Sequence, residues 1–327
     1  MKDNYGRNID YLRISITDRC NLRCLYCMPE EGVSDVGHSE ILRFDEIWRL
    51  CRIFASEGIR KVKITGGEPL VRLGVEDLIR GIREIPGIEN ITLTTNGVLL
   101  KSMYDGLVDA GLDSVTISLD TLDEKIFESI TRRNRFKEVM EGIRYADEAG
   151  RIPMKINTVP IPGVNDEDLA SLAEFARDHQ IHVRFIEMMP VGLGSTYTAL
   201  QEDDIRRRLE KKFGPFTPVR EKLGNGPCHY YAVPGFRGRI GFISAVSHKF
   251  CKDCNRVRLT ADGYLKTCLQ YDTGADFRSL LRGGADDRAI AEAYTEALRA
   301  KPRCHQFDKA GNLIEERDRR VMSQIGG

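Results

Sequence analysis

Two spacings of apolar residues alternate along the first 190 residues of the chain. Short β-rich runs are typical of strands, and they are separated by segments in which apolar residues recur at i, i+3, i+4 and i+7. That second spacing is typical of helices that bury one face. The sequence therefore predicts strands at Tyr11–Thr17, Lys61–Thr65, Asn90–Thr95, Ser114–Leu119, Met154–Val159 and His182–Glu187, with helical faces at 47–54, 75–82, 136–143 and 169–176 and a weaker one around 103–108.

This alternation of strands and helices predicts a parallel sheet with right-handed crossovers. Six such units fall within residues 1–190, whereas a closed eight-unit barrel needs ~250 residues. We therefore expect an α/β fold with an incomplete (βα)6 barrel of the TIM type, and a flat doubly wound sheet is the alternative. In either architecture the active site lies at the carboxyl ends of the strands.

The pattern changes after Pro190. Residues 191–327 predict an α+β extension, which would make a second region beside the partial barrel of residues 1–190. Its expected elements are a helix at 203–213, strands at 230–233 and 239–243, a hairpin of 257–260 with 264–267, and a helix at 289–298.

Charge and composition exclude several classes of protein. Lys+Arg and Asp+Glu each number 49, so bulk charge does not direct the chain to nucleic acid or to a lipid surface. No apolar run approaches the ~18 residues of a membrane span, and the first residues lack the apolar core of a signal peptide. We therefore expect a cytoplasmic protein, in which nine cysteines stay reduced and serve a purpose other than disulfides.

Three of these cysteines, Cys20, Cys24 and Cys27, lie within eight residues just after the first predicted strand. Soft thiolates select zinc, copper(I) or iron–sulfur clusters. Zinc needs four closed ligands, and no fourth Cys or His lies nearby. Three thiolates suit a four-iron cluster that keeps one iron open for another ligand. The alternative is three buried thiols that bind nothing.

A second triad consists of Cys251, Cys254 and Cys268. Here the spacing favours zinc and an iron–sulfur cluster about equally. A fourth zinc ligand would come from Cys228, His229, His248, Cys304 or His305.

Two further motifs give these triads a family context. Cys20-x3-Cys24-x2-Cys27, with Tyr26 before the last cysteine, together with Thr65-Gly66-Gly67-Glu68-Pro69, resembles the radical S-adenosylmethionine (SAM) superfamily. The second triad around Asn255-Arg256-Val257-Arg258, and the final Gly326-Gly327, resemble the GTP 3′,8-cyclase family of molybdenum cofactor biosynthesis. The resemblance covers essentially all 327 residues.

This resemblance implies a lyase with two [4Fe-4S] clusters. The first cluster binds SAM at its open iron and reduces it, which releases a 5′-deoxyadenosyl radical. The radical takes the ribose 3′ hydrogen of GTP, and the sugar radical attacks C8 of guanine. The product is (8S)-3′,8-cyclo-7,8-dihydroguanosine 5′-triphosphate, and the second cluster holds the guanine base.

The resemblance also implies which residues bind the ligands. The matching SAM positions are Tyr26, Gly67, Ser118 and Met189, and the matching GTP positions are Arg13, Lys63, Thr94, Lys155, Arg184, Arg256, Val257 and Arg258. Arg256 and Arg258 join the three cysteines of the first triad as catalytic residues. Lys63 stands where the family usually has Arg, which keeps the charge but loses the bidentate fork. The Gly-Gly tail resembles one that reaches into the active site.

The same resemblance implies partners as well: the GTP substrate, a flavodoxin-like or similar reductant, and cyclic pyranopterin monophosphate synthase as the next enzyme. It is also compatible with a homodimer. No nucleic acid and no membrane partner are expected.

The residues themselves agree with this interpretation. Each motif of residues 1–190 follows a predicted strand, and Arg13, Lys63, Lys155 and Arg184 lie on different strands, so a barrel gathers them around one anion. No Walker-type loop is present, so side chains would hold the phosphates. We also expect Gly66 and Gly67 to let the backbone approach a ligand, and Glu68 to accept from an ammonium. Two rivals remain: a radical SAM enzyme that modifies peptides, and a zinc-stabilised binding module without chemistry.

Overall fold

One sheet organises the chain. A computed structural model describes residues 1–33, 37, 39–307, 318 and 320–327, and its twelve strands form the order β12-β11-β10-β1-β2-β3-β4-β5-β6-β9-β8-β7. The first six strands run parallel in sequence order, as predicted. They are β1 (Tyr11–Ser15), β2 (Lys61–Thr65), β3 (Asn90–Thr95), β4 (Ser114–Ser118), β5 (Met154–Thr158) and β6 (His182–Ile186).

The first strand ends two residues earlier than the sequence pattern predicts. Thr17 already belongs to the following loop, where its carbonyl accepts from the Gly67 N–H at 2.7 Å and its hydroxyl from the Arg19 N–H at 3.1 Å. Polar contacts to the loop therefore replace the strand pairing here.

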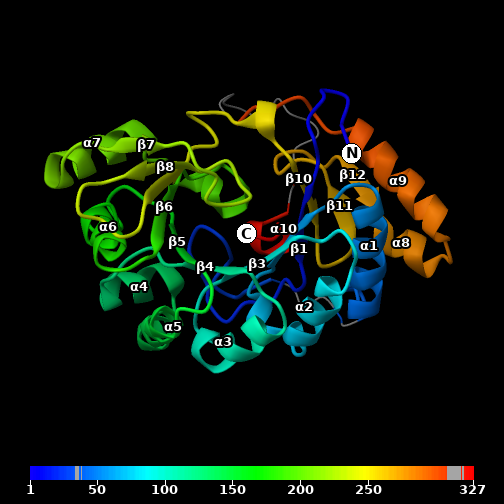
Figure 1. Ribbon diagram of the computed structural model, residues 1–327, viewed down its shortest axis with the longest axis horizontal. Coiled ribbons are helices and arrows are strands. Elements are labelled where there is room, and N and C mark those ends of the chain that lie inside the picture. Colours follow the sequence, from blue (N-terminus) through cyan, green and yellow to red (C-terminus); the bar gives the residue numbers. More distant parts are fainter. Residues whose placement is uncertain (34–36, 38, 308–317, 319) are drawn as a thin grey trace.

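Six helices cover the outer face of this curved sheet (Figure 1). Their apolar stripes explain the arrangement: α1, for example, buries Ile47, Leu50, Cys51 and Phe54 against the strands. The bounds are α1 (Phe44–Ser56), α2 (Val75–Arg83), α3 (Leu100–Asp109), α4 (Glu124–Thr131), α5 (Phe136–Ala149) and α6 (Leu169–Asp178). A flat doubly wound sheet would carry helices on both faces, so the incomplete barrel is the better description.

The sequence pattern missed α4. Its first turn is fixed by Asp123, whose carboxylate accepts from the N–H groups of Lys125 and Ile126 at 2.8 and 2.9 Å. It ends at Arg132, which is the only non-glycine residue with a positive φ (54°) among the described residues.

The C-terminal strands extend the sheet at both ends. β10 (Arg256–Leu259) pairs parallel with β1, and β9 (Ile240–Ile243) pairs parallel with β6. Antiparallel strands continue each end: β11 (Tyr264–Lys266) and β12 (Gly274–Asp276) beyond β10, and β8 (His229–Ala232) and β7 (Thr217–Val219) beyond β9. Residues 191–327 thus share one sheet with residues 1–190.

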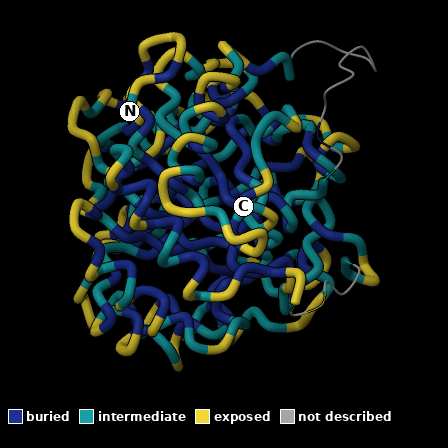
Figure 2. Tube along the Cα trace, turned by 90° about the vertical axis from the view of Figure 1, so that its right-hand side faces the viewer, coloured by how far each residue is buried: buried dark blue, intermediate teal, exposed yellow. Residues whose placement is uncertain are grey.

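The remaining elements complete the molecule. They are α7 (Glu202–Phe213), α8 (Phe277–Arg282), α9 (Asp287–Arg299) and α10 (Met322–Ile325), with short 3-10 turns η1 (Pro69–Val71), η2 (Gly192–Thr196) and η3 (Cys251–Asp253). The short helix α10 lies on the inner side of the sheet (Figure 1). Buried backbone forms the interior and exposed segments the periphery (Figure 2). No helix of the described residues is long and apolar enough to cross a bilayer.

Candidate active site with two cysteine triads

The inner side of the sheet encloses a cavity of about 610 Å³. It extends from the carboxyl ends of the strands, at Thr95 and Ser118, to their amino ends, at Asn90 and His182. Both cysteine triads line this one cavity. The residues predicted from the sequence to bind SAM or GTP line it too, with Val257 as the exception.

Strand alternation explains the position of Val257. On β10 the side chains of Arg256 and Arg258 project to one face and that of Val257 to the other. The Val257 side chain is 1% exposed and belongs to the hydrophobic core. The structure therefore gives no support for a side-chain contact between Val257 and GTP.

The loop that carries Cys20, Cys24 and Cys27 follows β1 directly. The N–H groups of Cys27 and Met28 donate to the Cys24 carbonyl at 2.9 and 3.0 Å, which forms a tight turn. The side chain of Asn96, at the end of β3, contacts the Cys20 sulfur at 3.7 Å. The turn and this contact hold the three thiols toward the cavity.

The C-terminal end of α4 anchors the same loop. The N–H groups of Arg23 and Leu25 donate to the carbonyls of Thr131 and Ile130, each at 2.9 Å. The αL conformation of Arg132 costs about 1–2 kcal/mol for a residue with a side chain, and its guanidinium donates to the Arg23 carbonyl at 3.3 Å. The helix end and its cap thus position the loop.

Burial sets the protonation state of the first triad. It raises the pKa of Cys20 to about 11 and that of Cys27 to about 12, and it also raises the pKa of Cys24. Three neutral thiols therefore face the cavity until a cationic group binds, because metal coordination deprotonates a thiol outright. This donor set of three unpaired thiols fits a four-iron cluster with one open iron.

The second triad stands on the C-terminal segments. Cys251 opens η3, Cys254 follows it, and Cys268 lies just beyond β11. Burial alone would raise the pKa of Cys254, but the positive charges of Lys301 and Arg256 outweigh it and lower the pKa to about 6. Cys254 is therefore a thiolate at neutral pH, ready to bind a cationic centre.

No three His, Cys, Asp or Glu side chains in the described part of the chain converge tightly enough to hold a single metal ion. A closed four-ligand zinc site is accordingly not preformed at either triad. An iron–sulfur cluster is a larger body than one ion, and its thiolate ligands stand farther apart.

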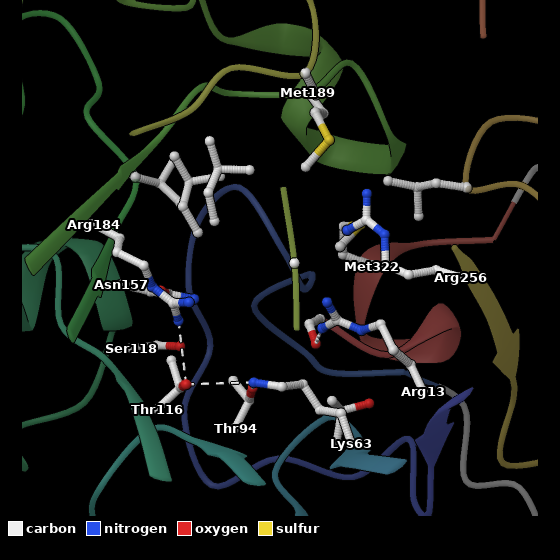
Figure 3. A pocket seen from close by; sticks show the side chains of 18 of the residues that line it. Arg13, Lys63, Thr94, Thr116, Ser118, Asn157, Arg184, Met189, Arg256 and Met322 are labelled. Carbon is white, nitrogen blue, oxygen red and sulfur yellow. Dashed lines mark hydrogen bonds between the residues drawn. The ribbon is translucent and has the colours of Figure 1, made fainter. Parts of the chain in front are cut away.

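Six cations point into the cavity from five strands: Arg13, Lys63, Lys155, Arg184, Arg256 and Arg258. Several of them are visible in Figure 3, where Arg184 enters from one side and Arg13 and Arg256 from the opposite side. Among the described residues, none of the six forms a salt bridge with a side-chain carboxylate. No side-chain carboxylate of the described residues therefore compensates this cluster of cations by direct pairing.

Neutral polar groups hold these cations in place. The Lys63 ammonium donates to the hydroxyls of Thr94 and Thr116 at 3.1 and 3.3 Å, and Arg184 donates to the same Thr116 hydroxyl and to Asn157 at 3.2 and 2.8 Å (Figure 3). Sequence reasoning missed Thr116 and Asn157. Both occupy inward positions on strands whose other face is apolar, and this alternation was the available signal.

The pKa values of the cations reflect burial and the charges of their neighbours. Burial, followed by the charges of the neighbouring cations, lowers the pKa of Lys63 well below its usual range. Burial and Arg184 lower the pKa of Lys155 to about 8, and burial is the main cause that lowers the pKa of Arg13 to about 10. A bound polyanion would favour the charged forms of these side chains and so raise all three pKa values.

The final glycines reach this cluster of cations, as the resemblance implies. The Gly326 carbonyl accepts from Arg258 at 2.7 Å, and the Gly327 carbonyl accepts from Arg13. Gly326 has a φ of 89°, and a Cβ atom there would lie 2.7 Å from the Thr65 hydroxyl. This position therefore requires glycine.

The Gly66-Gly67-Glu68 turn packs against the loop that follows β1. A Cβ atom at Gly66 or Gly67 would meet the carbonyl of Thr17 at 2.7 Å or that of Arg19 at 2.4 Å, so the absence of a side chain admits this backbone. Both glycines also line the cavity, and their contact with a ligand stays a prediction. Glu68 accepts from the Thr95 hydroxyl at 2.7 Å and from the Asn96 N–H at 2.6 Å. Burial raises the pKa of Glu68 to about 7.

The predicted SAM positions lie around the first triad. Gly67, Ser118 and Met189 line the cavity beside it. The Tyr26 hydroxyl donates to the Asp120 carboxylate at 2.7 Å, and burial raises the pKa of Asp120 to about 6. Asp120 thereby ties the cysteine loop to the end of β4.

Known proteins share this arrangement. A model of the radical SAM superfamily matches residues 14–176, and one described as Molybdenum Cofactor Synthesis C matches residues 181–307. Curated proteins named GTP 3′,8-cyclase from Pelotomaculum thermopropionicum and Petrotoga mobilis are 46% and 47% identical, and each alignment covers 100% of both chains.

A solved structure supports the fold. The crystal structure of Streptococcus suis SuiB bound to S-adenosylmethionine is similar with a TM-score of 0.62 at 18% identity, over 88% of this chain and 67% of that chain. Family models, full-length relatives and fold agree, so this chain belongs to the GTP 3′,8-cyclase family, a family of radical SAM enzymes in molybdenum cofactor biosynthesis.

Proposed function

We propose that this chain converts GTP to (8S)-3′,8-cyclo-7,8-dihydroguanosine 5′-triphosphate with two [4Fe-4S] clusters and SAM. One observation carries the proposal: two cysteine triads and six cations without a side-chain carboxylate partner face one cavity in the described part of the chain. A radical source, a binding group for the base and a polyphosphate site are then within reach of one substrate.

In this proposal the first triad holds the cluster that binds SAM, near Tyr26, Gly67, Ser118 and Met189. When bound, that cluster and SAM supply one electron and a 5′-deoxyadenosyl radical, which takes the 3′ hydrogen of GTP. The substrate then closes its C3′–C8 bond and gains one electron and one proton, so that product and GTP are isomers.

The chain's own residues bind and orient the substrate. Lys63 and Arg184 are held by neutral partners, and Lys155 lines the same cavity, so these three side chains are proposed to bind the triphosphate. Arg13 and Arg258, which contact the glycine tail, stand between the phosphate site and the second triad. Thr94 and Arg256 complete the proposed GTP contacts.

The second triad, Cys251, Cys254 and Cys268, would hold the cluster that binds guanine. The lowered pKa of Cys254 suits thiolate ligation, and the absence of an ion-sized cage among the described residues favours a cluster over zinc. Residues 1–190 would thus activate SAM, and residues 191–327 would bind the base.

The proposal extends to the surroundings of the enzyme. A flavodoxin-like or similar reductant would supply electrons in the cytoplasm, and cyclic pyranopterin monophosphate synthase would consume the product. A homodimer is part of the same proposal.

Metal and product analysis tests the proposal. Anaerobic reconstitution with iron and sulfide should give about eight irons per chain, and SAM, GTP and reductant should then yield the cyclic product. Cys24→Ala and Cys254→Ala should each leave about four irons, and Cys24→Ala should make no 5′-deoxyadenosine. The matched control Cys304→Ala removes an exposed thiol outside both triads and should keep all the iron.

Three outcomes would contradict the proposal. They are a colourless protein that holds only zinc, normal 5′-deoxyadenosine from Cys24→Ala, and the absence of GTP binding in anaerobic calorimetry. The last result would favour a peptide-modifying enzyme instead.

A further inference from the structure

A buried lysine follows α9 directly behind the second triad. Lys301 is 3% exposed, and its ammonium donates to the Arg256 carbonyl at 2.9 Å and to the Thr267 carbonyl. Both acceptors are neutral main-chain oxygens. The lysine charge is therefore held by hydrogen bonds but is not compensated by them.

The described residues offer Lys301 no carboxylate partner, whereas Lys266 nearby has one. The Lys266 side chain is fully buried and pairs with Asp318. A buried charge costs several kcal/mol unless an opposite charge compensates it. The groups that interact favourably with the Lys301 charge are the sulfur atoms of Cys254 and Cys268, which are the proposed cluster ligands.

The two acceptors of Lys301 also belong to the two chain segments that carry Cys254 and Cys268. Arg256 begins β10 two residues after Cys254, and Thr267 directly precedes Cys268. One ammonium therefore joins the segments that position two of the three thiols. At the third cysteine, the Arg7 guanidinium donates to the Cys251 carbonyl at 3.0 Å, but this guanidinium is already paired with Asp3.

We propose that Lys301 is a positioning residue and the counter-charge of the second iron–sulfur cluster. This inference rests on the proposed function, because it requires a cluster at Cys251, Cys254 and Cys268. Net charge and hydrogen bonds around a cluster set its reduction potential. A fixed positive charge favours the reduced form, which carries one more electron, so its removal lowers the potential.

The experiment measures that potential directly. The full-length chain carrying Cys24→Ala, which leaves the second triad as the cluster site, is reconstituted and titrated with dithionite while its paramagnetic signal is recorded. Lys301→Gln keeps a hydrogen-bond donor without the charge, and Lys301→Arg keeps the charge. Lys101→Gln, at an exposed lysine paired with Glu141, is the matched control.

We expect Lys301→Gln to reduce the equilibrium constant for cluster reduction about tenfold, a potential lower by about 59 mV, or to lose the second cluster. Lys301→Arg and Lys101→Gln should keep both the iron and the potential. Equal potentials in Lys301→Gln and its reference, or equal losses in Lys301→Gln and Lys301→Arg, would overturn the inference. A reference protein that assembles no iron–sulfur cluster would instead overturn the proposed function.

Discussion

The proposed contact between Lys155 and GTP predicts a pH dependence of binding, whose direction follows from the structure. This lysine on β5 is 8% exposed, and no side-chain carboxylate among the described residues pairs with it. Burial and the charge of Arg184 lower its pKa to about 8. A triphosphate beside it favours the ammonium form, so binding should raise this pKa and take up a proton.

The direction and size of the effect follow from that shift. Below pH 8 the ammonium is charged with and without ligand, and Lys155 contributes no pH dependence. Above pH 8 the free enzyme loses the proton that the complex keeps. At pH 9 only about one free Lys155 in eleven is charged, against about one in two at pH 8, so the affinity for GTP should fall about 5.5-fold between these pH values, or about 1.0 kcal/mol.

Anaerobic titration calorimetry at pH 8 and pH 9 measures this directly. The triphosphate of GTP is fully ionised in that range, because the last phosphate pKa lies near 6. At pH 8 the heat should depend on the ionisation enthalpy of the buffer, with about half a proton taken up by Lys155. The matched variant Lys155→Arg stays charged at both pH values and should lose this share of the dependence.

Lys63 also has a lowered pKa, so it adds the same proton uptake to the wild type and to Lys155→Arg. The difference in pH dependence between these two proteins therefore reports on Lys155 alone. The reasoning fails if wild-type affinity is the same at pH 8 and pH 9. It fails equally if Lys155→Arg shows the wild-type slope.

Three substitutions test other parts of the site. Arg258→Ala removes a charged donor worth about 1.5–3 kcal/mol and should weaken GTP binding at least tenfold in calorimetry while slow SAM cleavage persists; unchanged affinity would exclude Arg258 from the site. Gly326→Ala should displace the tail through the clash with Thr65 and lower product formation at least tenfold. Its control is Gly163→Ala, a position with a φ of 73° and no atom within 4 Å, and equal turnover in the two variants would argue against a role for the tail. Tyr26→Phe leaves the buried Asp120 carboxylate without one donor and should cost about 1–3 kcal/mol, measured by urea unfolding of the cluster-free protein; a smaller loss would mean that the bond does not stabilise the loop.

Local pattern was enough to predict the first six strands and most of their helices. The strands Lys61–Thr65 and Asn90–Thr95 have the predicted bounds, because in each of them apolar residues alternate with polar ones. The convergence of Arg13, Lys63, Lys155 and Arg184 also followed from topology alone. Parallel strands bring their inward side chains into one space whatever lies between them in the chain.

Contacts between distant residues could not be predicted in this way. No local signal shows that β10 pairs with β1 or β9 with β6, since these partners depend on the completed fold. The same holds for Lys301, because nothing in the sequence distinguishes it from other charged residues near the end of a helix. Only the packed structure shows that its ammonium donates to the carbonyls of Arg256 and Thr267, beside two cysteines of the second triad.

The pairing of β10 with β1 has a consequence for how the protein is made. Asp10 and Asn255 are 245 residues apart and bond at 2.6 Å beside this pairing, so one side of the cavity closes only after most of the chain exists. Such long-range strand pairing is slow, because the entropic cost of closing a large loop comes before any stabilising contact forms. During synthesis on the ribosome, the thiols of the first triad therefore emerge long before the strand that completes the cavity around them. Both triads can accordingly line one closed cavity only after β10 has been synthesised.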